Sequence, residues 1–203
     1  MELNKACWLG GSARSGKSSI VKILATESQI KTIHADDYFG NVMAKNFIAQ
    51  KEKYPNLWIM QNEMESVIIR KPLDEYIAIV MGTHKELFEL IKDDIMSLST
   101  SDMIIIEGFS LLPELLFDNG ISNACYLIST QAFFVEETLF WDKVKTQQEK
   151  DNINSMTKMM RKHIEEKAKD YGYRIIPVDN VHTLEVNARL VAEYFKLPLP
   201  QPI

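Results

Sequence analysis

This chain of 203 residues contains little cysteine and no excess of positive charge. Only two cysteines are present, Cys7 and Cys125, and both lie in short apolar runs. We therefore expect buried thiols in a reducing compartment and no disulfide. The formal net charge is −5 at pH 7. Because nucleic-acid backbones are bound mainly through basic residues, we expect no nucleic-acid partner.

Long hydrophobic runs and a basic N-terminal region are lacking as well. The longest apolar runs are far too short to span a bilayer, and residues 1–5 lack both parts of a signal peptide. We therefore expect a cytoplasmic protein without a membrane partner, either a monomer or a homodimer. No repeat or long linker divides the chain, so we expect a single domain over residues 1–203.

Short apolar runs alternate along the chain with longer segments of helical periodicity, which favours a parallel sheet covered by helices. Residues 103–106 are the clearest strand, because a continuous apolar run is typical of a strand buried on both faces. We expect Pro55 to end a helix. The strands are predicted at 5–10, 31–34, 102–107, 124–129 and 173–178, and the helices at 17–27, 41–53, 62–70, 73–98, 112–118, 152–170 and 183–196.

Residues 11–18 form a complete G-x-x-x-x-G-K-[ST] motif between a predicted strand and a predicted helix. Such a loop turns its N–H groups towards phosphates, and the helix start adds its positive dipole end. Lys17 would reach the β- and γ-phosphates, and the Ser18 hydroxyl would bind Mg²⁺. The alternative is a glycine-rich turn that matches by chance. The predicted nucleotide-binding residues are Gly11, Ser12, Ala13, Arg14, Ser15, Gly16, Lys17, Ser18 and Ser19.

Acidic residues follow two of the predicted strands at the edge that faces the loop. Asp36 and Asp37 follow strand 31–34, and either could accept a proton from a substrate hydroxyl or hold the water shell of Mg²⁺. Adjacent strand residues point to opposite sides, so we expect one base and favour Asp37. The alternative is a helix cap. Glu107 ends strand 102–107 and is predicted to support Mg²⁺; a solvated glutamate is the alternative.

Three segments in chain order, residues 11–18, 36–39 and 104–109, together resemble the P-loop small-molecule kinases. The Asp-Asp-Tyr-Phe and Glu-Gly-Phe pieces are most similar to the nicotinamide riboside kinase and uridine kinase group, and chloramphenicol phosphotransferase is similar too. The resemblance implies an α/β P-loop NTPase fold, with helices around a five-stranded parallel sheet of order 2-3-1-4-5. It also implies ATP, Mg²⁺ and a small-molecule acceptor with a hydroxyl group.

By the same resemblance, a lid closes over ATP at about residues 138–157. Lids of such kinases usually carry several arginines, whereas residues 141–147 contain lysines and no arginine. A lysine is a point charge and lacks the bidentate geometry of arginine. Arg161, on the following helix, is the nearest candidate for a phosphate clamp. The alternative for Arg161 is a charge on the helix surface.

The segment between the second and third strands, about residues 41–100, is too long for a simple crossover. We expect it to form the substrate side of the site; the alternative is a helical pair that only covers the sheet. Aromatic side chains near it could stack on an acceptor ring or belong to the core: Tyr38, Phe39, Tyr54 and Trp58. The histidines show no ligand spacing, and we predict no metal site for them: His34, His84, His163 and His182.

The leading hypothesis is an ATP-dependent phosphotransferase that moves the γ-phosphate to a hydroxyl of a small molecule, nucleoside-like or another metabolite. The first alternative is a regulatory ATPase or nucleotide-binding switch without a small-molecule acceptor. The chain has no guanine-selecting Asn-Lys-x-Asp segment, which speaks against the switch. The second alternative is a degenerate binding module. The intact Lys17, Ser18, Asp37 and Glu107 speak against it.

Overall fold

The centre of the molecule is a five-stranded parallel sheet of order β2-β3-β1-β4-β5, the order that the resemblance implied. The computed structural model describes residues 1–38, 51–99, 102–130, 144–179 and 181–198. The strands are β1 (Cys7–Gly11), β2 (Lys31–His34), β3 (Ile104–Glu107), β4 (Ala124–Ser129) and β5 (Arg174–Val178). Every strand overlaps a predicted one. The runs of β1, β3 and β4 are short and fully buried, whereas β2 is only partly buried at an edge of the sheet.

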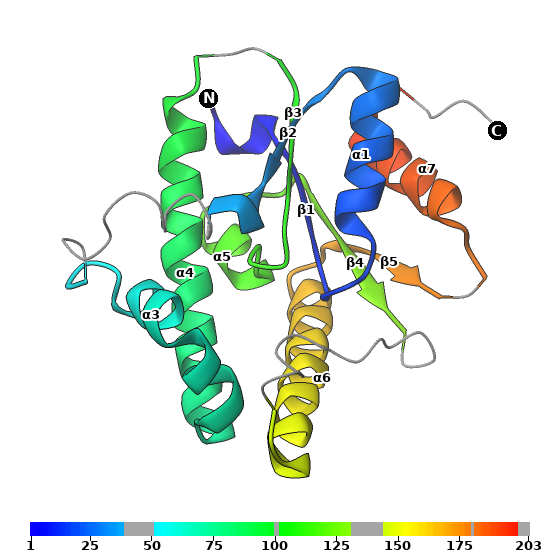
Figure 1. Ribbon diagram of the computed structural model, residues 1–203. Coiled ribbons are helices and arrows are strands. Elements are labelled where there is room, and N and C mark those ends of the chain that lie inside the picture. Colours follow the sequence, from blue (N-terminus) through cyan, green and yellow to red (C-terminus); the bar gives the residue numbers. More distant parts are fainter. Residues whose placement is uncertain (39–50, 100–101, 131–143, 180, 199–203) are drawn as a thin grey trace.

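Helices cover both faces of this sheet (Figure 1). The helices α1 (Lys17–Ser28) and α7 (Leu184–Phe195) pack together on one face. The opposite face is covered by α4 (Leu73–Ser97), α5 (Pro113–Asp118) and the second half of α6 (Gln147–Asp170). The remaining helices are α3 (Pro55–Arg70) and a short 3₁₀ helix, Leu3–Lys5. None of the helices within these described ranges is long and apolar enough to cross a membrane.

Side chains of β1 alternate between the two layers of the core. Trp8 points to the α4 side, where its ring lies 5.9 Å from that of Phe88, whereas Cys7 and Leu9 pack with α1 and α7. Cys7 and Cys125 are buried free thiols, as expected. Burial raises the pKa of both, that of Cys7 to about 11. The two thiols are therefore protonated and act as small apolar side chains.

Two helices begin earlier than the sequence predicted. We expected Pro55 to end a helix, but it is the first residue of α3, seven residues before the predicted start at 62. Proline suits that place because the first helical N–H has no partner within the helix. Helix α6 begins at Gln147, not at 152, because Thr146 and Glu149 form a capping box. Residues 41–50 of another predicted helix lie outside the described residues.

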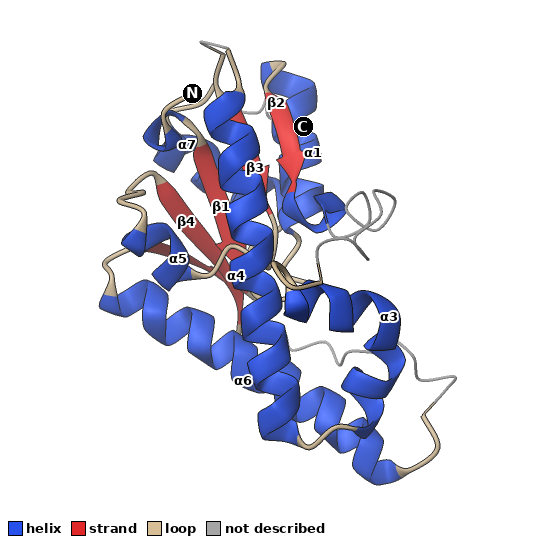
Figure 2. Ribbon diagram, turned by 90° about the vertical axis from the view of Figure 1, so that its left-hand side faces the viewer, coloured by secondary structure: helices blue, strands red, loops and turns tan. Residues whose placement is uncertain are grey.

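Three helices extend beyond the carboxyl ends of the strands (Figure 2). Helices α3 and α4 lie side by side, and both contact α6. The three helices belong to distant parts of the chain and meet next to the loop that follows β1. This arrangement places side chains of the 41–100 segment beside the predicted phosphate site, at the sheet edge where α/β proteins bind ligands.

Among the described residues, β5 forms one edge of the sheet and pairs only with β4. The N–H of Thr130 donates to the carbonyl of Val178 over 2.9 Å, so the backbone groups of Val178 face β4. Since successive residues of a strand alternate, the backbone of Pro177 faces the open edge. Proline has no N–H to offer there, which is the usual place of a proline within a sheet.

Candidate active site

The loop between β1 and α1 has the backbone of an anion site. Gly11 has a φ of 143°, and a Cβ at this residue would lie 2.1 Å from the carbonyl oxygen of Leu127, so only glycine fits. Gly16 has a φ of 84° and is the N-cap of α1, where no side chain caps the helix. The first N–H groups of α1 are thus left without partners in the helix, which suits a phosphate group.

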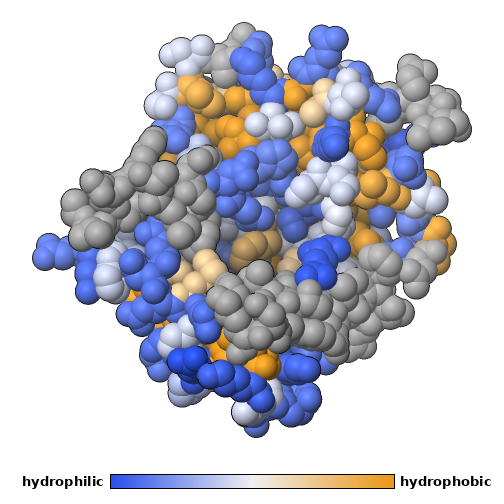
Figure 3. Space-filling view, in the orientation of Figure 1, coloured by the Kyte–Doolittle hydropathy of each residue, from blue (hydrophilic) through white to orange (hydrophobic). Residues whose placement is uncertain are grey.

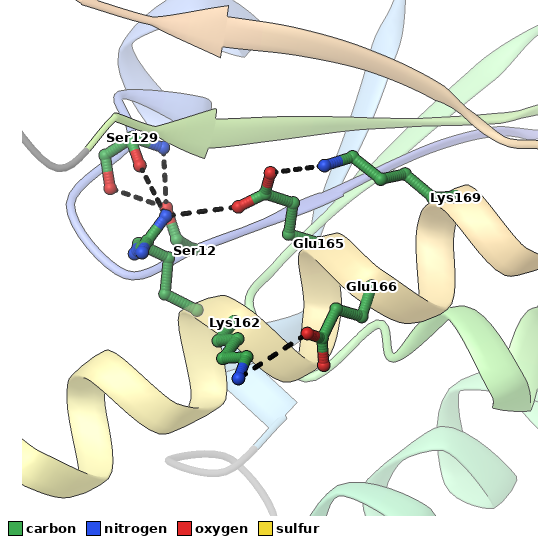
Figure 4. A network of polar contacts seen from close by, with 7 residues as sticks. Ser12, Ser129, Lys162, Glu165, Glu166 and Lys169 are labelled. Carbon is green, nitrogen blue, oxygen red and sulfur yellow. Dashed lines mark hydrogen bonds and ion pairs between the residues drawn. The ribbon is translucent and has the colours of Figure 1, made fainter.

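Side chains and backbone groups tie this loop to β4. The N–H of Ser12 donates to the carbonyl of Leu127 over 3.0 Å. The Ser12 hydroxyl accepts from the N–H of Ser129 over 3.0 Å and lies 2.9 Å from the Ser129 hydroxyl (Figure 4). Both serines are buried. Hydrogen bonds to two residues of one strand hold the first half of the loop in a single position.

Lys17 lies inside the loop and not on the surface. Its side chain is 6% exposed, and the ammonium group donates to the carbonyl of Ser12 over 2.8 Å. Burial lowers the pKa of Lys17, while the negative charges of Asp36 and Glu107 act in the opposite direction. The lysine therefore lies within the field of both carboxylates. Of the other predicted nucleotide-binding residues, Ser15 is buried, and Arg14, Ser18 and Ser19 are exposed to solvent.

The structure separates the two adjacent aspartates. Asp36 lines a cavity beside the loop and accepts a hydrogen bond from the N–H of Phe109. Its side chain faces solvent within the cavity, yet the surrounding protein desolvates it enough to raise its pKa, against the influence of Lys17. Asp37 is exposed and does not line that cavity. Gly108 permits Asp36 to approach the backbone beside Phe109, because a Cβ at residue 108 would lie 3.2 Å from an Asp36 oxygen.

Glu107 is buried at the end of β3, with 2% exposure, and so is not a solvated glutamate. One of its oxygens lies 2.6 Å from Nδ1 of His34, a residue to which the sequence assigned no role. Its other oxygen, Oε2, is buried and has no hydrogen-bond partner among the described residues. A buried carboxylate oxygen of this kind needs a cation or a donor.

The residues present fit a magnesium ion, since the orphaned Glu107 oxygen and the Ser18 hydroxyl are hard ligands of the kind Mg²⁺ prefers. Over the described ranges, no three His, Cys, Asp or Glu side chains gather into a metal site. The protein would therefore supply few ligands, and phosphate oxygens and water would supply the others, as is usual for Mg²⁺ bound with a nucleotide.

A cavity of about 380 Å³ opens beside the loop, between α3, α4 and α6. It meets the loop at Ala13, and Asp36, which follows β2, lines it as well. Its wall is mainly apolar, and Figure 3 shows hydrophobic residues within a hollow near the middle of this face. Four methionines line it: Met60, Met64, Met156 and Met160. The polar and charged side chains that line it are Asp36, Thr83, His84, Thr157 and Arg161.

The aromatic residues that the sequence suggested for acceptor stacking do not line this cavity. Tyr38 donates to an aspartate of α4, Tyr54 packs in a small core cluster, and the ring of Trp58 lies under a lysine. Phe39 lies outside the described residues. Two other aromatic side chains take the place beside the cavity: Tyr76 and Phe109.

Arg161 reaches the phosphate loop through β4. One Nη1 donates to the carbonyl of Ser129 over 3.4 Å and to Glu165 over 3.1 Å, and Ser129 in turn bonds to Ser12 (Figure 4). The side chain is 14% exposed, and its Nε is buried without a partner in the described structure. Arg161 is therefore not a free surface charge. Of the predicted lid, residues 138–143 lie outside the described residues, and 147–157 form the start of α6.

His84 is the site residue that sequence reasoning missed. It lies on α4 inside the cavity wall, 2% exposed, although the sequence placed it among scattered histidines without a role. The signal was its helical spacing, because Tyr76, Val80, His84 and Leu87 all fall on the buried face of α4. A histidine among apolar residues at that spacing indicates either a satisfied core residue or a pocket residue.

Comparisons with known proteins define the fold and nothing finer. No family model and no curated protein matches the chain. Among solved structures, TT1252 from Thermus thermophilus is similar with a TM-score of 0.53 and 14% identity, over 93% of this chain and 96% of that one.

Two further structures are similar, both with a TM-score below 0.5. A shikimate kinase from Acinetobacter baumannii in complex with shikimate has a TM-score of 0.47 and 14% identity, over 93% of this chain and 88% of that one. A dephospho-CoA kinase from Campylobacter jejuni has values of 0.44 and 16%, over 95% and 92%. At such identities an activity does not transfer, whereas the TT1252 structure shares the α/β architecture.

Proposed function

We propose that this protein is a P-loop kinase that transfers the γ-phosphate of ATP to a hydroxyl group of a small molecule. The observation that carries the proposal is the cavity of about 380 Å³ that meets the phosphate loop at Ala13 and is also lined by Asp36, which follows β2. A kinase needs a second site at this place, within reach of the transferring phosphate. A regulatory ATPase has no need of one, so the cavity favours the kinase. Residues 41–100 supply two of its walls through α3 and α4.

On the phosphate side, the proposed nucleotide site consists of residues 11–19. The N–H groups of the loop and the start of α1 would hold the phosphates, and Lys17 would follow the charge of the group in transfer. Ser18 and Glu107 would hold Mg²⁺ directly or through water. The ion would neutralise charge on the phosphate oxygens.

On the acceptor side, we propose Asp36 as the base in place of Asp37. Asp36 lines the cavity and lies in the field of Lys17, whereas Asp37 faces solvent. The acceptor oxygen forms a bond to the γ-phosphorus while the bond from that phosphorus to the β–γ bridging oxygen breaks. The hydroxyl proton passes to the Asp36 carboxylate, and ADP leaves. Only the deprotonated form of Asp36 can take up this proton.

Arg161 is proposed as the clamp of the transferring group. It borders the cavity and is held at Ser129, one hydrogen bond away from the phosphate loop. Its buried Nε is free to donate, and a guanidinium can bind two oxygens of a phosphoryl group at once. A lid formed by residues 138–157 stays part of this proposal.

The test is to incubate the purified chain with ATP, Mg²⁺ and a panel of hydroxyl compounds. The panel contains uridine and nicotinamide riboside, because the 36–39 and 107–109 pieces resemble kinases of those nucleosides. It also contains chloramphenicol and simple arylalkyl alcohols. A phosphorylated acceptor, detected by mass spectrometry and absent with Asp36→Asn, supports the proposal. Free phosphate without a phosphorylated acceptor would indicate a regulatory ATPase. ATP binding without any turnover would indicate a binding module.

A further inference from the structure

His84 brings an unpaired polar group into an apolar cavity. Both of its ring nitrogens are buried, and neither has a hydrogen-bond partner among the described residues. The ring is held edge-on against Phe109, with 4.5 Å between the ring centres. A buried polar group without a partner is costly. Water can pair with it while the cavity is wet, so a ligand that expels this water has to replace the hydrogen bond.

The charge state of His84 limits what that ligand can offer. Burial lowers the pKa of His84 to about 4; Glu114 acts against this shift, and the nearby His163 adds a smaller contribution in the same direction as burial. The imidazole is therefore neutral near pH 7. A neutral imidazole has one donor and one acceptor nitrogen. It suits an uncharged group such as a hydroxyl or an amide better than a carboxylate, which would seek a cation.

The rest of the wall agrees with an uncharged ligand. The charged side chains among the described lining residues are Asp36 and Arg161, and both lie towards the phosphate loop. The lining residues next to His84 are Val80 and Leu87, one helical turn away on α4, and Phe109, which contacts its ring. A polyol or a hydroxy acid would leave several polar groups unpaired against this surface. An apolar body would fit it, and methionine side chains adapt to irregular shapes.

We propose that the acceptor is an uncharged, largely apolar alcohol with a second hydrogen-bonding group that pairs with His84. The alcohol lies at Asp36 and the second group lies at His84, with Phe109 between these two residues. A volume of about 380 Å³ is within the range of small-molecule sites. The placing of the alcohol rests on the proposed function. The binding itself needs no phosphate transfer and is tested without it.

The experiment compares two probes that differ in one hydroxyl group, tyrosol and 2-phenylethanol. Tyrosol carries a phenolic hydroxyl at the end opposite its alcohol. We expect calorimetry on the complete chain without nucleotide to show about fivefold tighter binding of tyrosol, as one net hydrogen bond allows. His84→Phe should reduce this ratio to about one by weakening tyrosol alone. His84→Gln, which keeps a donor and an acceptor, should restore part of it.

Thr83→Val is the matched control, because its hydroxyl lines the same cavity but already donates to the carbonyl of Ile79 over 2.8 Å. The ratio between the probes should survive in this variant. Shikimate and glycerol are the comparison ligands and should bind at least tenfold more weakly than tyrosol. Equal affinity for tyrosol and 2-phenylethanol in the natural chain, or preferred binding of shikimate or glycerol, overturns the inference.

A second measurement covers the case in which His84→Phe does not fold. In the natural chain labelled with ¹⁵N at histidine, tyrosol should shift the His84 ring nitrogen signals and 2-phenylethanol should not. Equal shifts overturn the inference. Its failure is distinguishable from failure of the kinase proposal. A phosphorylated nucleoside whose turnover ignores His84 removes the inference alone. His84-dependent tyrosol binding without phosphorylation of any acceptor removes the kinase alone.

Discussion

The two sides of the cleft are built in different ways. The phosphate side is nearly continuous in the chain, since residues 11–19 form its loop and helix start, and its contacts are backbone hydrogen bonds and buried charges. The acceptor side is assembled from α3, α4 and α6, which are up to about a hundred residues apart in sequence, and its contacts are mainly apolar. The phosphate side holds its groups in fixed positions, whereas the acceptor side provides an apolar surface of matching shape.

Because of this difference, the two sides of the cleft should tolerate amino-acid substitutions to different extents. A loop whose glycine at 11 tolerates no Cβ allows few substitutions. A wall rich in methionine accepts changes of shape at small cost, because methionine has several rotatable bonds and no strict packing geometry. Under the proposed function, the same phosphate-transfer site can thus serve many acceptors. Substitutions on the phosphate side should therefore change phosphate transfer, and substitutions on the acceptor side should change acceptor binding and stability.

The largest effect is expected on the phosphate side. Lys17→Ala should lower phosphate transfer by a hundredfold or more, because one buried charge at the reacting group stabilises the transition state by about 3 kcal/mol. Lys22→Ala, on the exposed part of the same helix, is the control and should be silent. Steady-state kinetics and circular dichroism check both variants. Near-normal transfer by a folded Lys17→Ala protein would contradict the phosphate-loop assignment.

On the acceptor side, the largest expected effect is on stability. The folded-state pKa of His84, about 4, is below the unfolded value of 6.5, so the unfolded chain binds the extra proton between these pH values. Stability is therefore fully present above pH 6.5 and falls as the pH decreases towards 4. The loss is up to about 3 kcal/mol, since one pKa unit is worth about 1.4 kcal/mol. Urea unfolding at pH 7 and pH 4 should show a smaller loss for His84→Phe.

Asp36 lies between the two sides and should affect catalysis without affecting nucleotide affinity. Asp36→Asn should lower kcat by about a hundredfold, whereas Asp37→Asn should change it less than threefold. Because desolvation raises the pKa of Asp36, the acid limb of the kcat profile should lie above pH 3.8 and activity should fall as the pH decreases through that limb. A larger loss in Asp37→Asn would return the role of base to Asp37.

The smallest effect is expected at Arg161. Arg161→Ala should lower kcat by about tenfold and raise the KM for ATP less, because a clamp of the transferring group acts mainly in the transition state. Lys162→Ala on the exposed face of the same helix is the control. Rapid-quench kinetics separates the chemical step from product release. If both variants behave alike, Arg161 belongs to the scaffold of α6.

The sequence predicted the sheet because most of its strands are short apolar runs, although β2, Lys-Thr-Ile-His, has little apolar character. The phosphate loop was recognisable from an equally local pattern, since a strand, a glycine loop and a helix follow one another within about twenty residues, and its binding role stays a prediction. The sequence favoured Asp37 as the base, whereas Asp36 is the aspartate that lines the cavity, because the direction of each side chain depends on where β2 ends. The approach of Asp36 to the cavity also depends on Gly108, some seventy residues away.

The acceptor side was harder to predict because it exists only after folding. No sequence motif surrounds His84. It becomes a cavity residue because α3 and α6 pack beside α4 and complete the wall. The same holds for the aromatic residues. Tyr54 and Trp58 looked suitable by type and position, but Tyr54 packs in a small core cluster and Trp58 lies under Lys51, whereas Tyr76 lines the cavity. Tertiary contacts decided each case.

Pro177 at the open edge of β5 affects how copies of this chain can associate. An unpaired edge strand invites a strand of another copy to extend the sheet, which is a common route to aggregation. At Pro177 the row of backbone donors is interrupted, so an incoming strand would lose a hydrogen bond in the middle of a five-residue edge. The exposed pyrrolidine ring would also stand in its way. At high concentration, we therefore expect copies of this chain not to pair through the edge of β5.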